Sequence, residues 1–134
     1  MLFRSRLLAP SWPAEYGGGG LSALEKVIMA EEFSRAGVPT GGNNDPFSIQ
    51  MVGNTILNWG SEEMKAEFLP KIIGAEVEFA VGYSEPQAGS DAANMQLKAE
   101  KVEGGWKLNG QKTWTTSAHF ADWYWVGEIG RAHV

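Results

Sequence analysis

The hydrophobic pattern changes its period near Val77, and this change constrains the fold more than any other feature of the sequence. Before it, apolar residues such as Val27 and Ile28 recur close to the spacing of an α-helix. After it, the stretch from Val77 to Tyr83 is rich in β-branched and aromatic residues, as strands are. Helices followed by strands predict an α+β fold.

The first helix is predicted from its cap. After an irregular Pro- and Gly-rich connector over Leu8–Gly20, Ser22 and Glu25 have the spacing of a capping box. They start a helix predicted over residues 21–36. Its apolar residues, which lie between Leu24 and Phe33, are expected to pack inward.

The other elements are predicted from cap, turn and period signals. Pro46 suits the first turn of a helix, and Pro70 is expected to bend or interrupt the helix that starts at Ser61. The turn sequence Glu103-Gly104-Gly105 predicts a β-hairpin. The predicted helices cover residues 46–60 and 61–74, and the predicted strands cover residues 77–83, 96–102, 106–109, 112–116 and 123–126.

Composition excludes several classes of function. The chain of 134 residues has a net charge of -5 and no basic run, so a nucleic-acid partner is not expected. The sequence has no cysteine, which excludes disulfides, thiolate catalysis and cysteine-ligated metals and fits a cytoplasmic location. No apolar run approaches the roughly 20 residues of a membrane span, so none is predicted.

Both ends resemble translated sequencing adapters. Leu2–Ser5 matches one adapter strand, and Ile129–Val134 matches the opposite one. We therefore expect residues 1–5 and 129–134 to be adapter translation, the alternative being ordinary termini. His133 is excluded from functional argument on this ground.

The loop from Tyr83 to Asp91 is the first candidate binding element. It offers the hydroxyls of Ser84 and Ser90 and consecutive amides from Ala88 to Asp91, which together suit an anion such as a phosphate. Gly89 lets backbone approach a ligand closely. The alternative is a capped surface loop whose Ser90 and Asp91 side chains satisfy local amides. Chemistry alone does not separate the two.

The segment from Asn109 to Ser117 is the second candidate. On a strand, Trp114 and Thr116 share one face, so an indole could pack against a flavin ring while a hydroxyl donates to a ring nitrogen. The alternative is a core tryptophan beside a solvated threonine, which is favoured when the segment is considered by itself. An anion cradle near an aromatic platform is what a flavin nucleotide needs.

The remaining polar residues give weaker indications. Glu85 precedes Pro86 and has no second catalytic group nearby, so a structural hydrogen-bonding role is favoured over that of a general base. His119 has no partner for a metal in the sequence, and no metal site is predicted. The phosphate loop, the dinucleotide-binding glycine turn and the serine-hydrolase elbow are all absent.

In this order and spacing, the two clusters resemble the acyl-CoA dehydrogenase family. The first is Tyr-Ser-Glu-Pro-Gln-Ala-Gly-Ser-Asp over 83–91, and the second is Asn-Gly-Gln-Lys-Thr-Trp-Thr-Thr-Ser over 109–117. Further matching stretches are Leu8–Gly18, Gly60–Lys65, Phe68–Ile72 and Ala121–Trp123. The resemblance implies an acyl-CoA dehydrogenase-like α+β fold in which N-terminal helices precede an incomplete antiparallel β-domain. It divides the chain into a partial N-terminal helical domain over 6–76 and a partial middle β-domain over 77–128.

The same resemblance implies FAD as the cofactor and an acyl-CoA thioester as the substrate. It places Ser90 where the family meets acyl-CoA as well as FAD. Members often have a smaller hydrophobic residue in place of Tyr83 and commonly Gly in place of Gln87. The residues that fall at the family's cofactor contacts are Val81, Tyr83, Ser84, Gly89, Ser90, Trp114, Thr115 and Thr116.

The family oxidises the Cα–Cβ bond of its substrate and passes the electrons to an electron-transfer flavoprotein, usually as a tetramer. Its catalytic glutamate belongs to a C-terminal helical bundle, so no catalytic residue is expected in this chain, which should be inactive alone. Three alternatives stay open: an acyl-CoA oxidase, a flavin monooxygenase of the same superfamily, or a non-catalytic partner subunit of a hetero-oligomer. The acyl substrate is not predicted.

Overall fold

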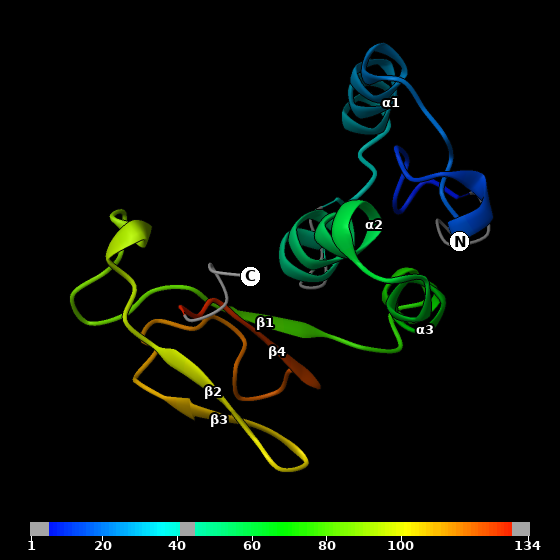
Figure 1. The fold of residues 1–134 in the computed structure, drawn as a ribbon. Helices are drawn as coiled ribbons and strands as arrows, with labels where there is room; N and C mark the ends of the chain where they lie inside the picture. Colours follow the sequence, from blue (N-terminus) through cyan, green and yellow to red (C-terminus); the bar gives the residue numbers. More distant parts are fainter. Residues whose placement is uncertain (1–5, 41–44, 130–134) are drawn as a thin grey trace. The chain divides into compact units, whose positions relative to one another are not determined.

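The computed structural model describes residues 6–40 and 45–129, and the chain divides into two compact units between Glu78 and Phe79. The first unit is helical, whereas the second contains all the strands of the described residues (Figure 1). The α+β class with helices first is therefore confirmed. The division falls next to the boundary expected between residues 76 and 77.

Helix α1 (Ala23–Arg35) begins at the predicted capping box. The Ser22 hydroxyl accepts a hydrogen bond from the Glu25 amide at 3.3 Å, and the Glu25 carboxylate accepts one from the Ser22 amide at 2.8 Å. These two bonds satisfy backbone donors that the first helical turn leaves without partners.

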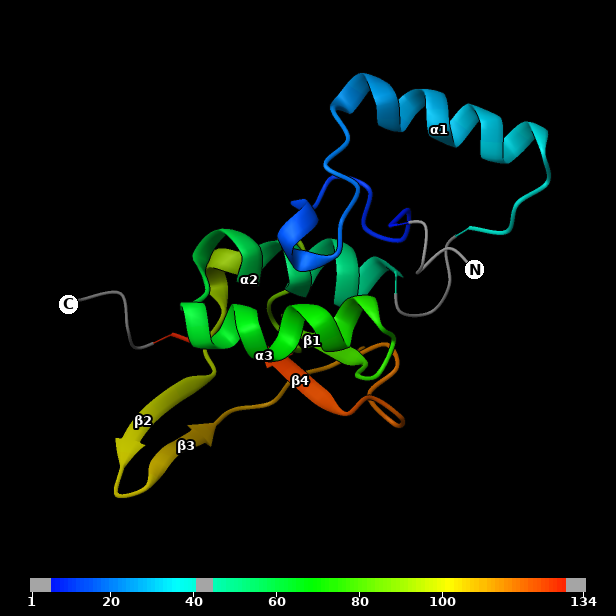
Figure 2. The same cartoon turned by 90° about the vertical axis from the view of Figure 1, so that its right-hand side faces the viewer.

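The apolar face of α1 is exposed, which contradicts the expected inward packing. Leu24, Val27 and Ile28 are 70%, 56% and 52% exposed, and no residue of α1 is buried. In two perpendicular views, α1 lies apart from the other helices of its unit (Figures 1 and 2). The prediction of a helix here is confirmed, but no described element covers its apolar face.

The core of the first unit lies where three helical segments pack together: η2 (Asp45–Gly53), α2 (Asn54–Trp59) and α3 (Glu62–Ile73). Each contributes aliphatic side chains at helical spacing, and their burial removes apolar surface from water. The most deeply buried aliphatic residues of these segments are Ile49, Val52, Ile56, Leu69, Ile72 and Ile73.

The second predicted helix is wound differently from the expectation. Its first part, η2, is a π-helix, and only α2 is α-helical. At their junction, the Asn54 side-chain amide donates to the Gln50 carbonyl, and the Thr55 hydroxyl donates to the Met51 carbonyl, both at 2.8 Å. Side chains therefore bond to carbonyls four residues earlier, in competition with the regular backbone ladder.

Helix α3 starts where predicted but is not interrupted. The Ser61 hydroxyl accepts a hydrogen bond from the Met64 amide at 3.3 Å, as an N-cap does. Pro70 lies within α3, and its carbonyl accepts a bond from the Gly74 amide at 2.9 Å. Because Pro70 stands in the last turns, its missing amide removes only one bond near the helix end.

The predicted connector over Leu8–Gly20 belongs to the core. It contains the short helix η1 (Ala14–Tyr16), and Trp12 is only 1% exposed. The Trp12 indole nitrogen donates to the Asn54 side-chain oxygen at 2.8 Å. A Cβ atom at Gly53 would lie 2.4 Å from the Trp12 ring, so the ring packs directly on the helix backbone.

The second unit holds two strand pairs. Strands β2 (Lys98–Val102) and β3 (Gly105–Asn109) form the predicted antiparallel hairpin, whose turn uses Gly104 at φ 80°. Strands β1 (Phe79–Gly82) and β4 (Trp123–Val126) are parallel, unlike the antiparallel expectation. A parallel pair needs a long crossover connection, and everything from Tyr83 to Asp122 serves as one.

The end of the described chain joins this unit. The Ile129 amide donates to the Leu97 carbonyl at 2.8 Å, and Ile129 forms a parallel bridge with Lys98. The rest of the suspected adapter, residues 1–5 and 130–134, lies outside the described residues. The adapter origin therefore stays a prediction.

Two leucines test where the stability of the first unit resides. Leu69 is fully buried in α3, whereas Leu24 on α1 is 70% exposed. We expect Leu69→Ala to lower the free energy of unfolding by about 2–5 kcal/mol, because it leaves a cavity. Leu24→Ala should change it by less than about 0.5 kcal/mol. Urea unfolding of both variants measures the difference; equal effects would contradict the assigned core.

Candidate functional site

The Tyr83–Asp91 loop leaves the end of β1 and makes a tight turn. The Glu85 amide donates to the Ala88 carbonyl at 2.7 Å, and the Ala88 amide donates back to the Glu85 carbonyl at 3.0 Å. Pro86 follows Glu85, at a position where its fixed φ favours the turn. The Ala88 amide, which the sequence offered to an anion, is thus used within the protein.

The rest of the loop is open to solvent. Gly89, Ser90 and Asp91 are exposed, and a Cβ atom at Gly89 would meet nothing within 4 Å. Among residues 6–40 and 45–129, their amides have no hydrogen-bond acceptor. Asp91 makes no side-chain cap bond to the following short helix η3 (Ala92–Asn94). The structure therefore does not support the alternative in which these side chains satisfy local amides.

Glu85 anchors the loop to the protein. Its side chain is 2% exposed, and its two oxygens accept hydrogen bonds from the Gln96 amide at 2.8 Å and the Leu97 amide at 2.9 Å. The Gln87 side-chain amide donates to it at 2.7 Å, and the Lys112 ammonium at 2.8 Å. This is the structural hydrogen-bonding role that the sequence favours for Glu85.

The same contacts keep Glu85 ionised. Together they lower the pKa of Glu85 from 4.5 to about 2. The hydrogen bond from Lys112 is the largest cause, burial opposes it, and the hydrogen bonds from the Leu97 and Gln96 amides and from the Gln87 side chain add to the lowering. A carboxylate with such a low pKa, engaged by four donors, is a poor proton acceptor.

Lys112 joins the two clusters predicted from sequence. Besides its 2.8 Å bond to Glu85, its ammonium donates to the Tyr83 carbonyl at 3.1 Å. The neighbouring Thr113 amide donates to the Ser84 carbonyl at 2.9 Å. The middle of the second cluster is therefore fixed to the start of the first. Sequence reasoning missed Lys112 because its partner lies 27 positions away and nothing local links them.

Trp114 does not lie on a strand, and the predicted strand over 112–116 is wrong. Residues 111–115 have no regular secondary structure, and Trp114 adopts φ 53° in the left-handed region. Such a residue breaks the alternation of faces, so the expected sharing of one face by Trp114 and Thr116 does not apply. Trp114 is 79% exposed, which also excludes the core-tryptophan alternative within the described chain.

The hydroxyls near Trp114 have different environments. The Thr115 hydroxyl lies 2.9 Å from the Tyr124 hydroxyl of β4, whereas Thr116 is exposed in a turn. The Thr113 hydroxyl is buried and has no hydrogen-bond partner among the described residues. A buried hydroxyl without a partner is rare in proteins, and a polar ligand at this place would satisfy it.

Tyr124 is a second residue that sequence reasoning missed. A Cβ atom at Gly82 would lie 2.1 Å from the Tyr124 hydroxyl, so the tyrosine rests on the glycine backbone. The β1–β4 register places Val81 opposite Trp125 and Gly82 opposite Val126. The glycine before Tyr83 was the available sequence signal, because an isolated glycine in a strand indicates a close approach.

Ser90 and Trp114 are not joined directly. Both are exposed, and no hydrogen bond in the described part of the chain links them. The structure brings together the start of the first cluster and the middle of the second, which are Tyr83 and Ser84 with Lys112 and Thr113.

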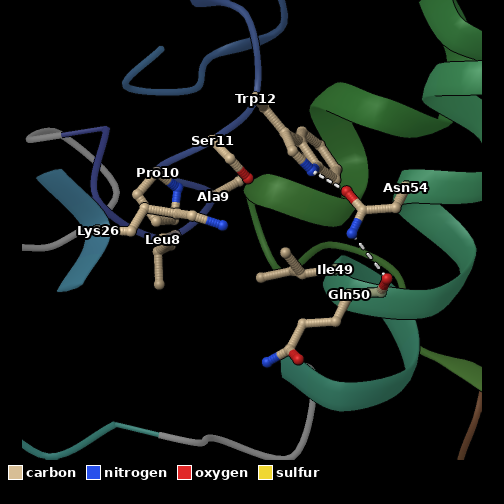
Figure 3. Close-up of a pocket in the computed structure, with 9 residues that line it drawn as sticks. All are labelled: Leu8, Ala9, Pro10, Ser11, Trp12, Lys26, Ile49, Gln50 and Asn54. Atoms are coloured by element: carbon tan, nitrogen blue, oxygen red, sulfur yellow. Dashed lines mark hydrogen bonds between the residues drawn. The ribbon is translucent and has the colours of Figure 1, made fainter. Parts of the chain in front are cut away.

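The first unit contains a separate cavity of about 420 Å³ (Figure 3). Lys26 of α1 lies with Leu8 and Pro10 on one side of it, opposite Ile49 and Gln50. Its lining among the described residues contains no carboxylate, thiol or imidazole, and we assign it no chemistry.

Two further features are absent from residues 6–40 and 45–129. No group of three His, Cys, Asp or Glu side chains is placed to hold a metal ion. No helix in these ranges is both long and apolar enough to cross a bilayer.

The low pKa of Glu85 predicts a pH dependence of stability. A carboxyl group whose pKa falls on folding contributes stability that is fully present above about pH 4.5 and is lost as the pH falls towards 2. In denaturant titrations between these limits, we expect Glu85→Gln to remove part of the wild-type pH dependence. Glu100→Gln, at an exposed position of β2, should keep it. Identical slopes for wild type and Glu85→Gln would contradict the assignment.

Comparison with known proteins identifies relatives over both units. Residues 2–76 match the acyl-CoA dehydrogenase N-terminal domain, and residues 80–129 match the acyl-CoA dehydrogenase middle domain. The chain is 41% identical over 124 residues to acyl-CoA dehydrogenase FadE26 of Mycobacterium tuberculosis, an alignment that covers 92% of this chain and 30% of the relative.

Solved structures agree. The ChsE4-ChsE5 complex from Mycobacterium tuberculosis contains a chain that matches with a TM-score of 0.79 and 39% identity, covering 98% of this chain and 33% of that one. PigA with FAD and proline matches with a TM-score of 0.68 and 31% identity, covering 89% of this chain and 31% of PigA. The chain thus spans about a third of the length of the proteins it resembles. On the domain matches and this identity, the chain belongs to the acyl-CoA dehydrogenase family.

Proposed function

We propose that this chain is the flavin-holding part of a longer FAD-dependent acyl-CoA dehydrogenase. The observation that carries the proposal is the junction in which Lys112 and Thr113 bond to the backbone of Tyr83 and Ser84. It joins a loop whose Gly89, Ser90 and Asp91 amides find no acceptor in the described part of the chain to a segment with an exposed indole. PigA, a relative solved with FAD, supports FAD as the cofactor.

The residues present suit a flavin nucleotide. The amides of Gly89 to Asp91 have no acceptor among the described residues and could donate to its phosphates. The exposed indole of Trp114 gives a flat apolar surface for the ring, and the orphaned Thr113 hydroxyl lies at the junction. The complete set that we propose to contact FAD is Val81, Tyr83, Ser84, Gly89, Ser90, Trp114, Thr115 and Thr116, with Ser90 also at the acyl-CoA.

The reaction proposed is oxidation of the Cα–Cβ bond of an acyl-CoA thioester, for which bound FAD would supply the hydride acceptor. This chemistry also needs a base for the α-proton. Glu85 does not fit that role, because four donors engage its carboxylate. We nominate no base among the described residues, and we propose an electron-transfer flavoprotein as the acceptor of the electrons and a tetramer as the assembly.

A second candidate is a partner subunit of a hetero-oligomer that holds a site without the base. The observation that favours it is the match to a chain of the ChsE4-ChsE5 complex, whose name describes an assembly of two different proteins. The two candidates differ in one measurable property. A catalytic subunit reduces its flavin when acyl-CoA is added, whereas a non-catalytic partner does so only with the other subunit present.

The experiment is flavin binding by the full-length protein and by two tryptophan variants. Trp114 and Trp59 are 79% and 85% exposed, which makes Trp59→Ala the matched control. We expect purified wild type to carry FAD and to lose its visible flavin absorbance when acyl-CoA is added without oxygen. Trp114→Ala should weaken FAD binding about tenfold through lost stacking, and Trp59→Ala should not.

A wild-type protein that binds no FAD would end the proposal. Equal FAD affinity in both tryptophan variants would instead remove Trp114 from the proposed contacts.

A further inference from the structure

We propose that Lys112 and Glu85 act together as positioning residues that set the spacing between the two flavin-binding segments. The inference rests on the proposed function and adds to it a pair of residues that are not themselves assigned to the cofactor. Their role would be to hold the backbone from which the cofactor contacts project.

The contacts around Ser84 carry the inference. Lys112 bonds to the residue before Ser84, through the Tyr83 carbonyl, and to the residue after it, through the Glu85 carboxylate. The Thr113 amide bonds to the Ser84 carbonyl itself. Three consecutive residues of the loop are thus fixed to two consecutive residues of the other segment. This pattern fixes both their distance and their register.

Burial separates this ion pair from the others described. The Lys112 and Glu85 side chains are 4% and 2% exposed, whereas at least one partner in every other described ion pair is more than half exposed. A buried pair is weak evidence of stability, because desolvation offsets most of the attraction. Its geometry is nevertheless strict, since an unpaired buried charge is strongly unfavourable.

The same carboxylate extends the fixed region in the other direction. Glu85 accepts hydrogen bonds from the amides of Gln96 and Leu97. These bonds close the loop that contains Gly89 and Ser90. The far end of that loop therefore shares an anchor with the segment that leads to Trp114. Because cofactor contacts have to be held close to their productive positions, a shift of this anchor should weaken all of them together.

The test uses the full-length protein with Lys112→Met, Glu85→Gln and the control Lys101→Met. Lys112→Met and Glu85→Gln keep the approximate side-chain size and remove one charge each. Lys101 lies exposed on β2 and makes no ion pair among the described residues. The measurements are the FAD dissociation constant, the midpoint of thermal unfolding and amide hydrogen exchange at Gln96, Leu97 and Thr113.

We expect Lys112→Met and Glu85→Gln each to raise the FAD dissociation constant about tenfold or more, as small displacements of positioned groups do. Exchange at the three amides should become faster, while the turn end of the β2–β3 hairpin, where Val102 pairs with Gly105, keeps its protection. Lys101→Met should match wild type in all three measurements. Glu85→Gln provides a second variant if Lys112→Met does not fold.

Two results would overturn the inference. One is wild-type FAD affinity in a folded variant of either residue, which would leave the pair a structural contact only. The other is loss of folding in both variants, which would make the pair a requirement of the fold. Absence of FAD from wild type is distinguishable from both, since it removes the proposed function as well.

Discussion

The buried bond between Lys112 and Glu85 is the interaction that fixes the path of the chain between β1 and β4 in the second unit. The strands of this unit are short, and most residues of the β2–β3 hairpin are exposed, so hydrophobic burial there is small. Few apolar side chains are available to fix the long crossover between β1 and β4. A carboxylate that gathers two backbone amides, a side-chain amide and an ammonium supplies the missing constraint.

The first unit is organised by different means. Its core is aliphatic, and the Trp12 ring lies against the backbone at Gly53 while its nitrogen bonds to Asn54. Sequence-distant segments meet there through close packing, which tolerates no added atom at Gly53. In the second unit, the segments around Glu85 and Lys112 are instead joined by polar contacts that involve main-chain groups. A polar anchor leaves the surrounding surface open, which suits the flavin binding proposed for this unit.

The sequence predicts an element correctly wherever the residues that determine it lie close together along the chain. The caps at Ser22 and Ser61, the turn at Gly104 and the strand over 123–126 all have this property, and the structure has each of them. The parallel pairing of β1 with β4 and the bond from Lys112 to Glu85 depend on tertiary packing. The β-rich composition around Trp114 favoured a strand, but the hydrogen bonds at Lys112 and Thr113 hold that segment outside any sheet.

The left-handed backbone of Trp114 has a consequence for which sequences this position tolerates. A bulky residue at φ 53° costs about 1–3 kcal/mol, which glycine would avoid. Glycine, however, would remove the ring that faces solvent there. Selection for stability therefore favours glycine at this position, whereas selection for an exposed aromatic ring favours tryptophan. A homologue with glycine at this position would be more stable and would lack the exposed aromatic ring.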